Sequence, residues 1–237
     1  SPLPQGDWVA LLPGSKPAKL SVGMPFLLEV ADRLVPLHPG CRFLMPVAPT
    51  TSLAALQRFA GARNPIASFY GSGIASIEPA SDGSPWRRLI TIAGTEIHLQ
   101  EEPPAHGPLS QCLLALTTVG ANTAELGALG VPMIVIVPTQ HLGVMQAWDG
   151  WMGLLARLPG LRWCIGALLS AWRLRQHGFL AWPNISAGRA VVPERVGAIR
   201  PEAIAAEAAD WLSSPERLQC HRDDLRLLRG QPGAVAA

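Results

Sequence analysis

Charged residues are scarce in this chain. Only 15% of its 237 residues are Asp, Glu, Lys or Arg, whereas roughly a quarter is usual in soluble domains. The net charge of +2 gives no reason to expect nucleic-acid binding. With 49% hydrophobic residues, the chain can bury a substantial core in one large domain or two small ones. This composition indicates either a buried α/β sheet or a membrane-associated protein.

Cysteines are few, and none is closely paired with another. Cys41, Cys112, Cys164 and Cys220 are scattered, without the short spacings that are typical of metal sites. We therefore expect reduced thiols in the cytoplasm. Nothing around them marks a thiol of low pKa, so a catalytic cysteine is the less favoured alternative.

The first residues, SPLPQGDW, lack the pattern of a signal peptide. No positively charged stretch is followed by an apolar run, so we expect no secretion signal. These residues lead directly into a predicted strand, as a linker between domains does. We therefore expect the chain to be the second half of a longer protein.

Short apolar runs alternate with helical segments along the chain. Strands are predicted near residues 8–12, 41–47, 90–99, 113–117, 133–137 and 179–182. Helices are predicted at 25–34, 53–62, 201–212 and 213–228. Asp82-Gly83 is a hairpin signal that predicts pairing in the strand region that follows. The alternation predicts an α/β fold with a mostly parallel sheet and crossover helices.

Residues 115–149 have the pattern of a βαβ unit: a strand, a Gly turn, a short helix, a second strand and a polar loop. In such units ligands bind at the carboxyl ends of the strands. The polar clusters at 118–125 and 139–146 both follow predicted strands. They are therefore candidate parts of one site.

A second candidate follows the first predicted strand. Gly14 permits close approach of the backbone, and Ser15 and Lys16 could donate to a phosphate near a helix N-terminus. The segment is not a Walker motif, because the second Gly and the trailing Lys-Ser/Thr are missing. An ordinary strand-to-helix turn is the alternative interpretation.

Residues 148–178 are rich in Trp and Arg. Arg157, Pro159 and Arg162 interrupt every long apolar window, so the segment is not expected to span a bilayer. Trp and Arg together suit a membrane surface or a protein interface. The alternative is a pair of helices that packs on the sheet or on a partner domain.

Three motifs, in this order, carry a resemblance to a known family. They are LLPGSK at 11–16, TTVGANTAELGALGVPMIVIV at 117–137 and WPNISAGRAVVPE at 182–194. Together they resemble the carboxyl-terminal, nucleotide-sugar-binding domain of the lipid-A-disaccharide synthase family. These are inverting glycosyltransferases of GT-B architecture, with two Rossmann-like domains. The middle motif is also similar to the GT-B enzyme that adds N-acetylglucosamine to the lipid-linked peptidoglycan precursor.

The resemblance implies one Rossmann-like domain over residues 1–237, with 148–178 as a helical insertion and the amino-terminal acceptor domain absent. It implies a UDP-sugar donor such as UDP-N-acetylglucosamine, a lipid-linked acceptor, and neither a metal nor a cofactor. The expected location is the cytoplasm, with peripheral contact to the inner membrane face. A missing amino-terminal domain or a second copy is the expected partner, and nucleic acid is not.

The resemblance also implies roles for particular residues. Gly120 and Asn122 would lie beside the diphosphate, Glu125 would bind the ribose, and Arg189 would contact the diphosphate. His141 is the candidate acid or base. The residues implied to bind the donor are Gly14, Ser15, Lys16, Thr118, Gly120, Asn122, Thr123, Glu125, Gln140, Gln146, Asn184, Arg189 and Glu194.

The chain departs from the family pattern in several places, one of which is a Trp-rich segment longer than expected. Lys16 stands where the family usually has Arg, which removes a bidentate fork. Val119-Gly120-Ala121 stands where the family has Ser-Gly-Thr, which removes two hydroxyls near the phosphates. Two alternatives to a transferase therefore stay open. They are a UDP-sugar epimerase of the same architecture and a non-catalytic module that binds a nucleotide sugar.

Overall fold

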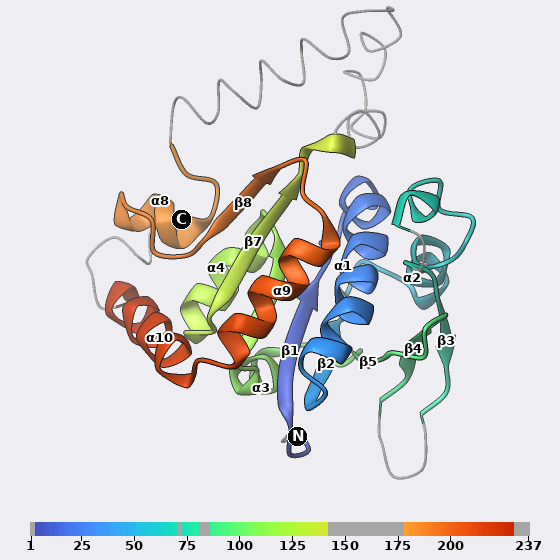
Figure 1. Cartoon of the computed structure of the whole chain (residues 1–237), viewed down its shortest axis with the longest axis horizontal. Helices are drawn as coiled ribbons and strands as arrows, with labels where there is room; N and C mark the ends of the chain where they lie inside the picture. Colours follow the sequence, from blue (N-terminus) through green and yellow to red (C-terminus); the bar gives the residue numbers. More distant parts are fainter. Residues whose placement is uncertain (1–2, 71–72, 81–85, 142–177, 230–237) are drawn as a thin grey trace, which may run out of the picture.

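A computed structural model describes residues 3–70, 73–80, 86–141 and 178–229, which form an eight-stranded sheet flanked by helices (Figure 1). The strands lie in the order β3-β4-β5-β2-β1-β6-β7-β8. Their bounds are β1 Asp7–Leu12, β2 Cys41–Pro46, β3 Ala75–Glu78, β4 Arg88–Thr91, β5 Glu96–Gln100, β6 Leu114–Thr118, β7 Met133–Pro138 and β8 Glu194–Gly197. The helices are α1 Pro17–Leu37, α2 Leu53–Ala60, α3 His106–Gln111, α4 Ala121–Leu129, α8 Trp182–Ala187, α9 Pro201–Leu212 and α10 Pro215–Arg229, with 3-10 turns η1 Ala67–Tyr70 and η2 Thr139–His141.

The sheet is mostly parallel. Strands β5, β2, β1, β6, β7 and β8 all run in one direction, and β4 and β3 add an antiparallel hairpin at the β5 edge. The parallel strands point towards the upper edge of the molecule in Figure 1. This arrangement confirms the prediction of a Rossmann-like α/β fold with crossover helices.

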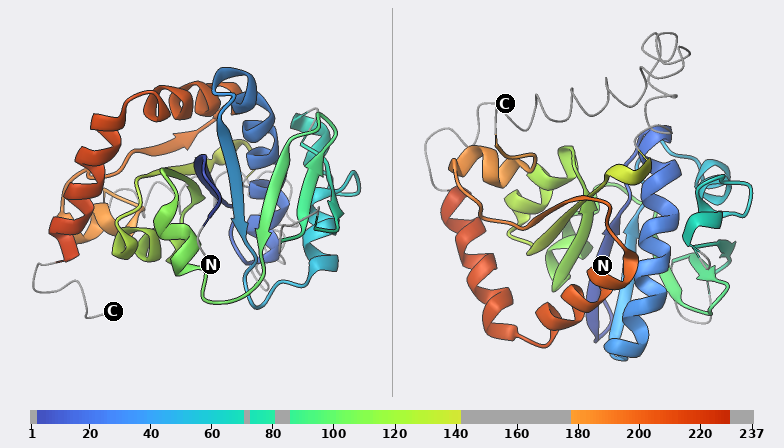
Figure 2. Two further views of the ribbon diagram at one scale, coloured as in Figure 1. Left: turned by 90° about the horizontal axis from the view of Figure 1, so that it is seen from below. Right: turned by 45° about the horizontal axis from the view of Figure 1, so that its top comes forward.

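Helices cover both faces of the sheet, as the two views in Figure 2 show. On one face α1, α2 and α9 bury an apolar cluster against Val9, Leu11 and the other strand residues that point that way. On the other face α3, α4 and α8 pack against Trp8, Ala10 and their neighbours. Helix α10 contributes Leu218 to the first cluster and Leu225 to the second, so it crosses from one layer to the other. The alternation of side chains along each strand produces these two cores.

Helix α1 contains the whole segment predicted around residues 25–34 but begins eight residues earlier, at Pro17. Pro17, rather than Pro25, occupies the first turn of the helix, where proline is favoured. Pro25 lies inside α1 instead, where it cannot donate to the carbonyl of Ser21. The buried amide of Asn64 donates to that carbonyl at 2.9 Å. This tertiary hydrogen bond compensates for the missing helical one, so α1 continues past Pro25.

Close backbone approach also fixes the position of α1. A Cβ added to Gly23 would lie 2.6 Å from the carbonyl oxygen of Pro13, in the loop that follows β1. No side chain fits at that distance unless the backbone moves. The glycine therefore sets how closely α1 packs on the loop that leads into it.

The outer edge of β3 is closed by a side chain. The amide of Gln57, on α2, donates to the carbonyl of Ala75 at 3.0 Å and accepts from the N–H of Ile77 at 2.6 Å. It therefore takes the place of a neighbouring strand. Edge strands with unpaired backbone groups can pair with other chains, so this contact protects the sheet.

The strand predicted at 179–182 is wrong. The N–H groups of Leu180 and Ala181 donate to the carboxylate of Glu194 rather than to a neighbouring strand. Helix α8 begins at Trp182, with Pro183 in its first turn. The eighth strand is the short β8, which no prediction covers.

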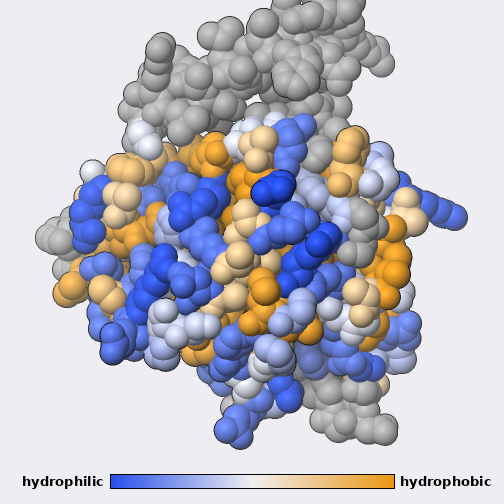
Figure 3. All heavy atoms as spheres, viewed as in Figure 1, coloured by the Kyte–Doolittle hydropathy of each residue, from blue (hydrophilic) through white to orange (hydrophobic). Residues whose placement is uncertain are grey.

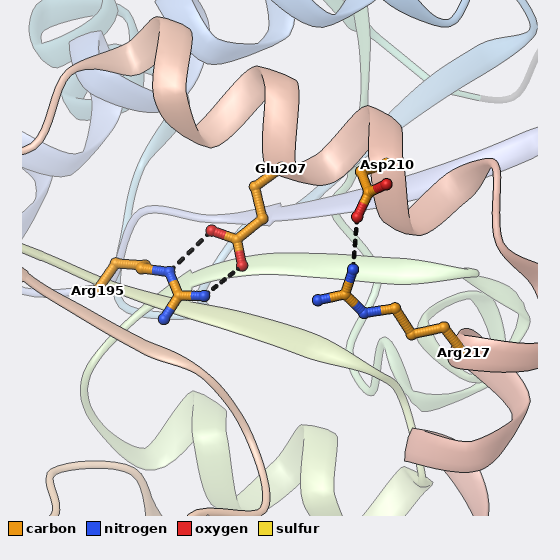
Figure 4. A network of polar contacts seen from close by, with 4 residues as sticks. All are labelled: Arg195, Glu207, Asp210 and Arg217. Atoms are coloured by element: carbon orange, nitrogen blue, oxygen red, sulfur yellow. Dashed lines mark hydrogen bonds and ion pairs between the residues drawn. The ribbon is translucent and has the colours of Figure 1, made fainter.

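Ion pairs connect β8 to α9 and α9 to α10 (Figure 4). The guanidinium of Arg195 on β8 donates to both carboxylate oxygens of Glu207 on α9, at 2.8 and 2.6 Å. Arg217 on α10 pairs with Asp210 on α9 at 2.5 Å.

On the face seen in Figure 3, hydrophilic and hydrophobic residues are intermixed over the helices.

Two predicted features fall outside the part that the structure describes. These are the Asp82-Gly83 turn and, apart from Gly178, the Trp/Arg-rich segment 148–178. Within the described ranges, no helix has both the length and the apolar character needed to span a membrane.

Candidate functional site

The order of the strands creates a switch point between β1 and β6. From β1 the chain moves to β2 on one side, and it later returns to β6 on the other side. Leu12, the last residue of β1, lies beside Thr117, so the loops that follow the two strands are neighbours. Helix α1 leaves towards one face and α4 towards the other. In open α/β sheets this divergence makes the crevice where ligands bind.

Two glycines with positive φ line this crevice. Gly14, after β1, has φ +101°, and Gly120, after β6, has φ +149°. A Cβ on Gly14 would lie 2.8 Å from Cβ of Lys19 and 3.3 Å from Oγ1 of Thr118. A Cβ on Gly120 would lie 2.8 Å from Nζ of Lys19. Glycine at these two positions therefore permits the backbone turns and leaves space for the side chain of Lys19.

Lys19 spans the switch point between the two loops, and none of the sequence motifs includes it. It lies in the first turn of α1, and its ammonium donates to the carbonyl of Val119 at 2.6 Å. The side chain therefore runs from the first turn of α1 to the loop after β6. The only sequence signal is its spacing of three residues from Lys16, which is one helical turn.

The backbone around Lys19 is also suited to an anion. The N-cap residues of α1 and α4 are Lys16 and Gly120, and neither makes a side-chain capping bond. The first N–H groups of α4 therefore lack a side-chain acceptor, whereas α1 begins with Pro17, which has no N–H to donate. The buried hydroxyl oxygen of Thr118 has no hydrogen-bond partner either. Two helix N-termini, one ammonium and one hydroxyl together favour a phosphate or diphosphate.

Of the residues predicted for this site, the structure brings Gly14, Thr118 and Gly120 together. Ser15 and Lys16 are exposed beside them. The carbonyl of Ser15 accepts a long hydrogen bond of 3.5 Å from the loop after β2. Asn122 is partly buried in the first turn of α4. The loops after β1 and β6, given as separate candidates from the sequence, are thus adjacent in the structure.

Thr123 and Glu125 make contacts within the protein. The buried hydroxyl of Thr123 donates to the carbonyl of Gly120 at 2.9 Å and accepts from the N–H of Trp182 at 3.1 Å. It therefore joins α4 to α8. Glu125 lies 3.2 Å from His106 on α3 and is partly exposed. Its carboxylate remains accessible to a ligand, whereas the Thr123 hydroxyl is enclosed.

Asn184 and Glu194 form a hydrogen-bonded clasp around the start of α8. The side-chain amide of Asn184, 1% exposed, donates to the Val192 carbonyl at 2.8 Å and to Glu194 at 2.7 Å. Its oxygen accepts from the N–H groups of Val191 and Val192 at 2.7 and 2.8 Å. The Glu194 carboxylate also accepts hydrogen bonds from the N–H groups of Leu180 and Ala181, so its oxygens are likewise bonded within the protein. These polar groups hold the loop between α8 and β8 in place.

The remaining predicted residues are distributed around the sheet. Arg189 is exposed and lies 3.9 Å from Asp224 on α10. The amide of Gln140, in η2 after β7, donates to the backbone of Ile199 at 2.7 Å and accepts from it at 3.2 Å. His141 is the last residue of η2. Gln146 lies outside the described residues.

Burial shifts the pKa values of two described cysteines and of His98. Burial raises the pKa of Cys41 to about 11 and that of Cys112 to about 12, so both thiols are protonated at neutral pH. Burial lowers the pKa of His98, whose ring lies against Trp8 and Trp86. In the described part of the chain, no cluster of three or more His, Cys, Asp or Glu side chains could hold a metal ion.

The fold and the crevice define a Rossmann-like domain with a candidate phosphate site at its switch point. Comparison with curated proteins finds relatives named lipid-A-disaccharide synthase. The chain is 27% identical over 230 residues to the one from Anaeromyxobacter sp. (strain K), which covers 95% of this chain and 46% of that protein. It is also 27% identical over 231 residues to that of Syntrophus aciditrophicus (strain SB), covering 96% and 46%.

A third relative of the same name, from Thiobacillus denitrificans, is 27% identical over 247 residues, covering 99% of this chain and 50% of that protein. The chain thus spans about half the length of these relatives. No protein-family model matches it. The resemblance predicted from the three motifs is confirmed.

Proposed function

We propose that this chain is the donor-binding part of a glycosyltransferase of lipid A synthesis, and that it binds a UDP-sugar such as UDP-N-acetylglucosamine. The observation that carries this proposal is the similarity to lipid-A-disaccharide synthases along 95% of the chain. The crevice between β1 and β6 supports it, because its glycines, helix N-termini and ammonium suit a diphosphate.

The proposed reaction is an inverting transfer of the sugar to a lipid-linked acceptor. As the bond to the sugar breaks, negative charge develops on the UDP diphosphate. Backbone N–H groups at a helix N-terminus and a nearby cation stabilise such charge. Glu125 would take the ribose hydroxyls, since a carboxylate accepts two hydrogen bonds well. His141, after β7, is our candidate for the proton transfer.

We further propose that residues 1–237 act as one domain, with 148–178 as a helical insertion, and that the acceptor is bound largely by residues outside this domain. Such an acceptor would bring the protein to the cytoplasmic face of the inner membrane. We retain the proposal that four further residues line the donor cleft. They are Gln146, Asn184, Arg189 and Glu194. For Asn184 and Glu194 the clasp around α8 favours an indirect role, because their polar atoms are already bonded within the protein.

Isothermal titration calorimetry tests the proposal. UDP and UDP-N-acetylglucosamine should bind in the micromolar-to-millimolar range, and ADP should bind more weakly. Absence of binding by both uridine nucleotides would exclude a donor-binding role for this chain. Binding of UDP-N-acetylglucosamine without transfer to a lipid-linked acceptor would indicate a module that binds the donor only.

A further inference from the structure

Lysine is confined to one place in this sequence. Of its 19 lysines and arginines, only Lys16 and Lys19 are lysines, and both belong to the junction between β1 and α1. They differ in environment. Lys16 is exposed at the N-cap of α1, whereas Lys19 is partly buried and reaches across the crevice to Val119. The sequence draws attention to Lys16, but the geometry points to Lys19.

The position of the Lys19 ammonium follows from two close approaches. The stem of Lys19 passes over Gly14, where an added Cβ would meet it at 2.8 Å. Its Nζ lies over Gly120, where an added Cβ would meet it at the same distance. The charge is therefore placed at the N-terminus of α4, while its own backbone lies in the first turn of α1. A cation held between two helix N-termini raises the positive potential of a region that already favours anions.

We propose that Lys19 is the cation that binds the phosphate or diphosphate group in this crevice. Its bond to the Val119 carbonyl fixes the ammonium at the opening between the loops, and its charge attracts the anion without breaking that bond. A partly buried charge is screened less by salt than the exposed Lys16. The unpartnered hydroxyl of Thr118, near Gly14, is a candidate donor to the same anion.

The proposal rests on the proposed function only for the identity of the anion, a nucleotide diphosphate. The position of the cation rests on the contacts of Lys19 alone. The competing interpretation is a purely structural role, in which Lys19 only connects the start of α1 to the loop after β6. Such a tie would affect every ligand of the crevice, whether or not it carries phosphate.

Calorimetry with uridine, UMP, UDP and inorganic pyrophosphate separates these interpretations. In Lys19→Met, we expect UDP and pyrophosphate to bind about 10- to 100-fold more weakly, as for loss of a charged hydrogen-bond partner. Uridine should bind equally to wild type and variant. Arg226→Met is the charge-matched control, because Arg226 packs on Gly130 at the far end of α4. Its UDP affinity should equal that of the wild type.

The outcomes separate the inference from the proposed function. Two results with a wild type that binds UDP would show that the inference is wrong while the proposed function stands. In the first, Lys19→Met binds UDP as tightly as the wild type does. In the second, Lys19→Met loses affinity for uridine by the same factor as for UDP. If wild type does not bind UDP, the proposed function fails. Pyrophosphate then decides the inference, which is supported only if Lys19→Met binds it more weakly than wild type does.

Amine labelling tests Lys19 without removing it, should Lys19→Met fail to fold. In Lys16→Arg, Lys19 carries the sole lysine ε-amino group, so acetylation at this position can be followed by mass spectrometry. Pyrophosphate at saturating concentration should slow acetylation of Lys19 by at least about tenfold if the anion covers the amine. An unchanged rate would overturn the inference.

Discussion

Replacing Asn184 with alanine tests whether this residue serves the fold or the ligand. Resemblance to the transferase family places Asn184 in the donor cleft, but the structure buries its side chain in the clasp with Glu194. Alanine would leave the N–H groups of Val191 and Val192 without their acceptor. It would also remove the side-chain donor to the Val192 carbonyl and one of the donors to Glu194. The expected effect is therefore a loss of stability.

The magnitude follows from the two buried N–H groups. Val191 and Val192 are 5% and 2% exposed, so water reaches them poorly. Each unsatisfied buried group costs about 1–3 kcal/mol, which gives a central value of about 4 kcal/mol for the pair of groups. In a domain of this size, each kcal/mol lowers Tm by about 2–4 °C. Asn184→Ala should therefore melt about 8–16 °C below the wild type.

Differential scanning calorimetry measures the melting temperature, and titration with UDP well below it measures the affinity of the folded protein. Ser186→Ala, an exposed change on the same helix, should alter neither quantity. If Asn184→Ala keeps its Tm but loses UDP affinity, the clasp is not the role of Asn184. A direct contact with the donor would then be the better explanation.

Three further changes test other contacts of the fold. Gln57→Ala uncovers the edge of β3, so we expect a loss of about 1–2 kcal/mol in unfolding free energy and more aggregation in light scattering. Gly23→Ala places a methyl group 2.6 Å from a backbone oxygen, so chemical denaturation should show a loss of about 1–3 kcal/mol. His98→Gln should make Tm depend less on pH below about 6.5, because burial lowers the pKa of His98 and protonation therefore favours the unfolded chain.

Each of these changes has its own control. Gly107→Ala on α3 meets nothing within 4 Å and should be tolerated, so equal losses at Gly23 and Gly107 would contradict the packing argument. Gln57→Glu keeps the acceptor but not the donor, and its aggregation should be intermediate. For His98, the destabilisation develops as pH falls from about 6.5 towards its lowered pKa. An identical pH profile of Tm in wild type and His98→Gln would contradict this explanation.

Much of the fold can be predicted from periodicity and turn residues. The strands β1, β2, β6 and β7 and helix α9 lie where their apolar patterns predict them. The failures have physical causes that only the folded chain provides. A local pattern cannot indicate that Asn64 replaces the hydrogen bond lost at Pro25, or that Glu194 takes the N–H groups of Leu180 and Ala181. These bonds connect residues that are not neighbours in sequence.

The candidate site was less predictable than the sheet. The rule that ligands bind at the carboxyl ends of strands identifies the loops with Gly14 and Gly120. It cannot identify Lys19, because the bond to Val119 joins residues 100 positions apart. Family motifs also mark residues without distinguishing their roles. Asn184 stands in the most specific motif, yet its contacts in the structure are those of a packing residue.

The space around position 19 favours a lysine there, in a chain whose only other lysine is Lys16. The ammonium lies so close to Gly120 that even an added methyl group would come within 2.8 Å. A guanidinium is a planar group with three nitrogens and needs more room than a compact ammonium. Arginine would therefore have to bend away from Gly120 or open the crevice. The two glycines and Lys19 thus form one steric unit, and a change at either glycine should alter the position of the charge.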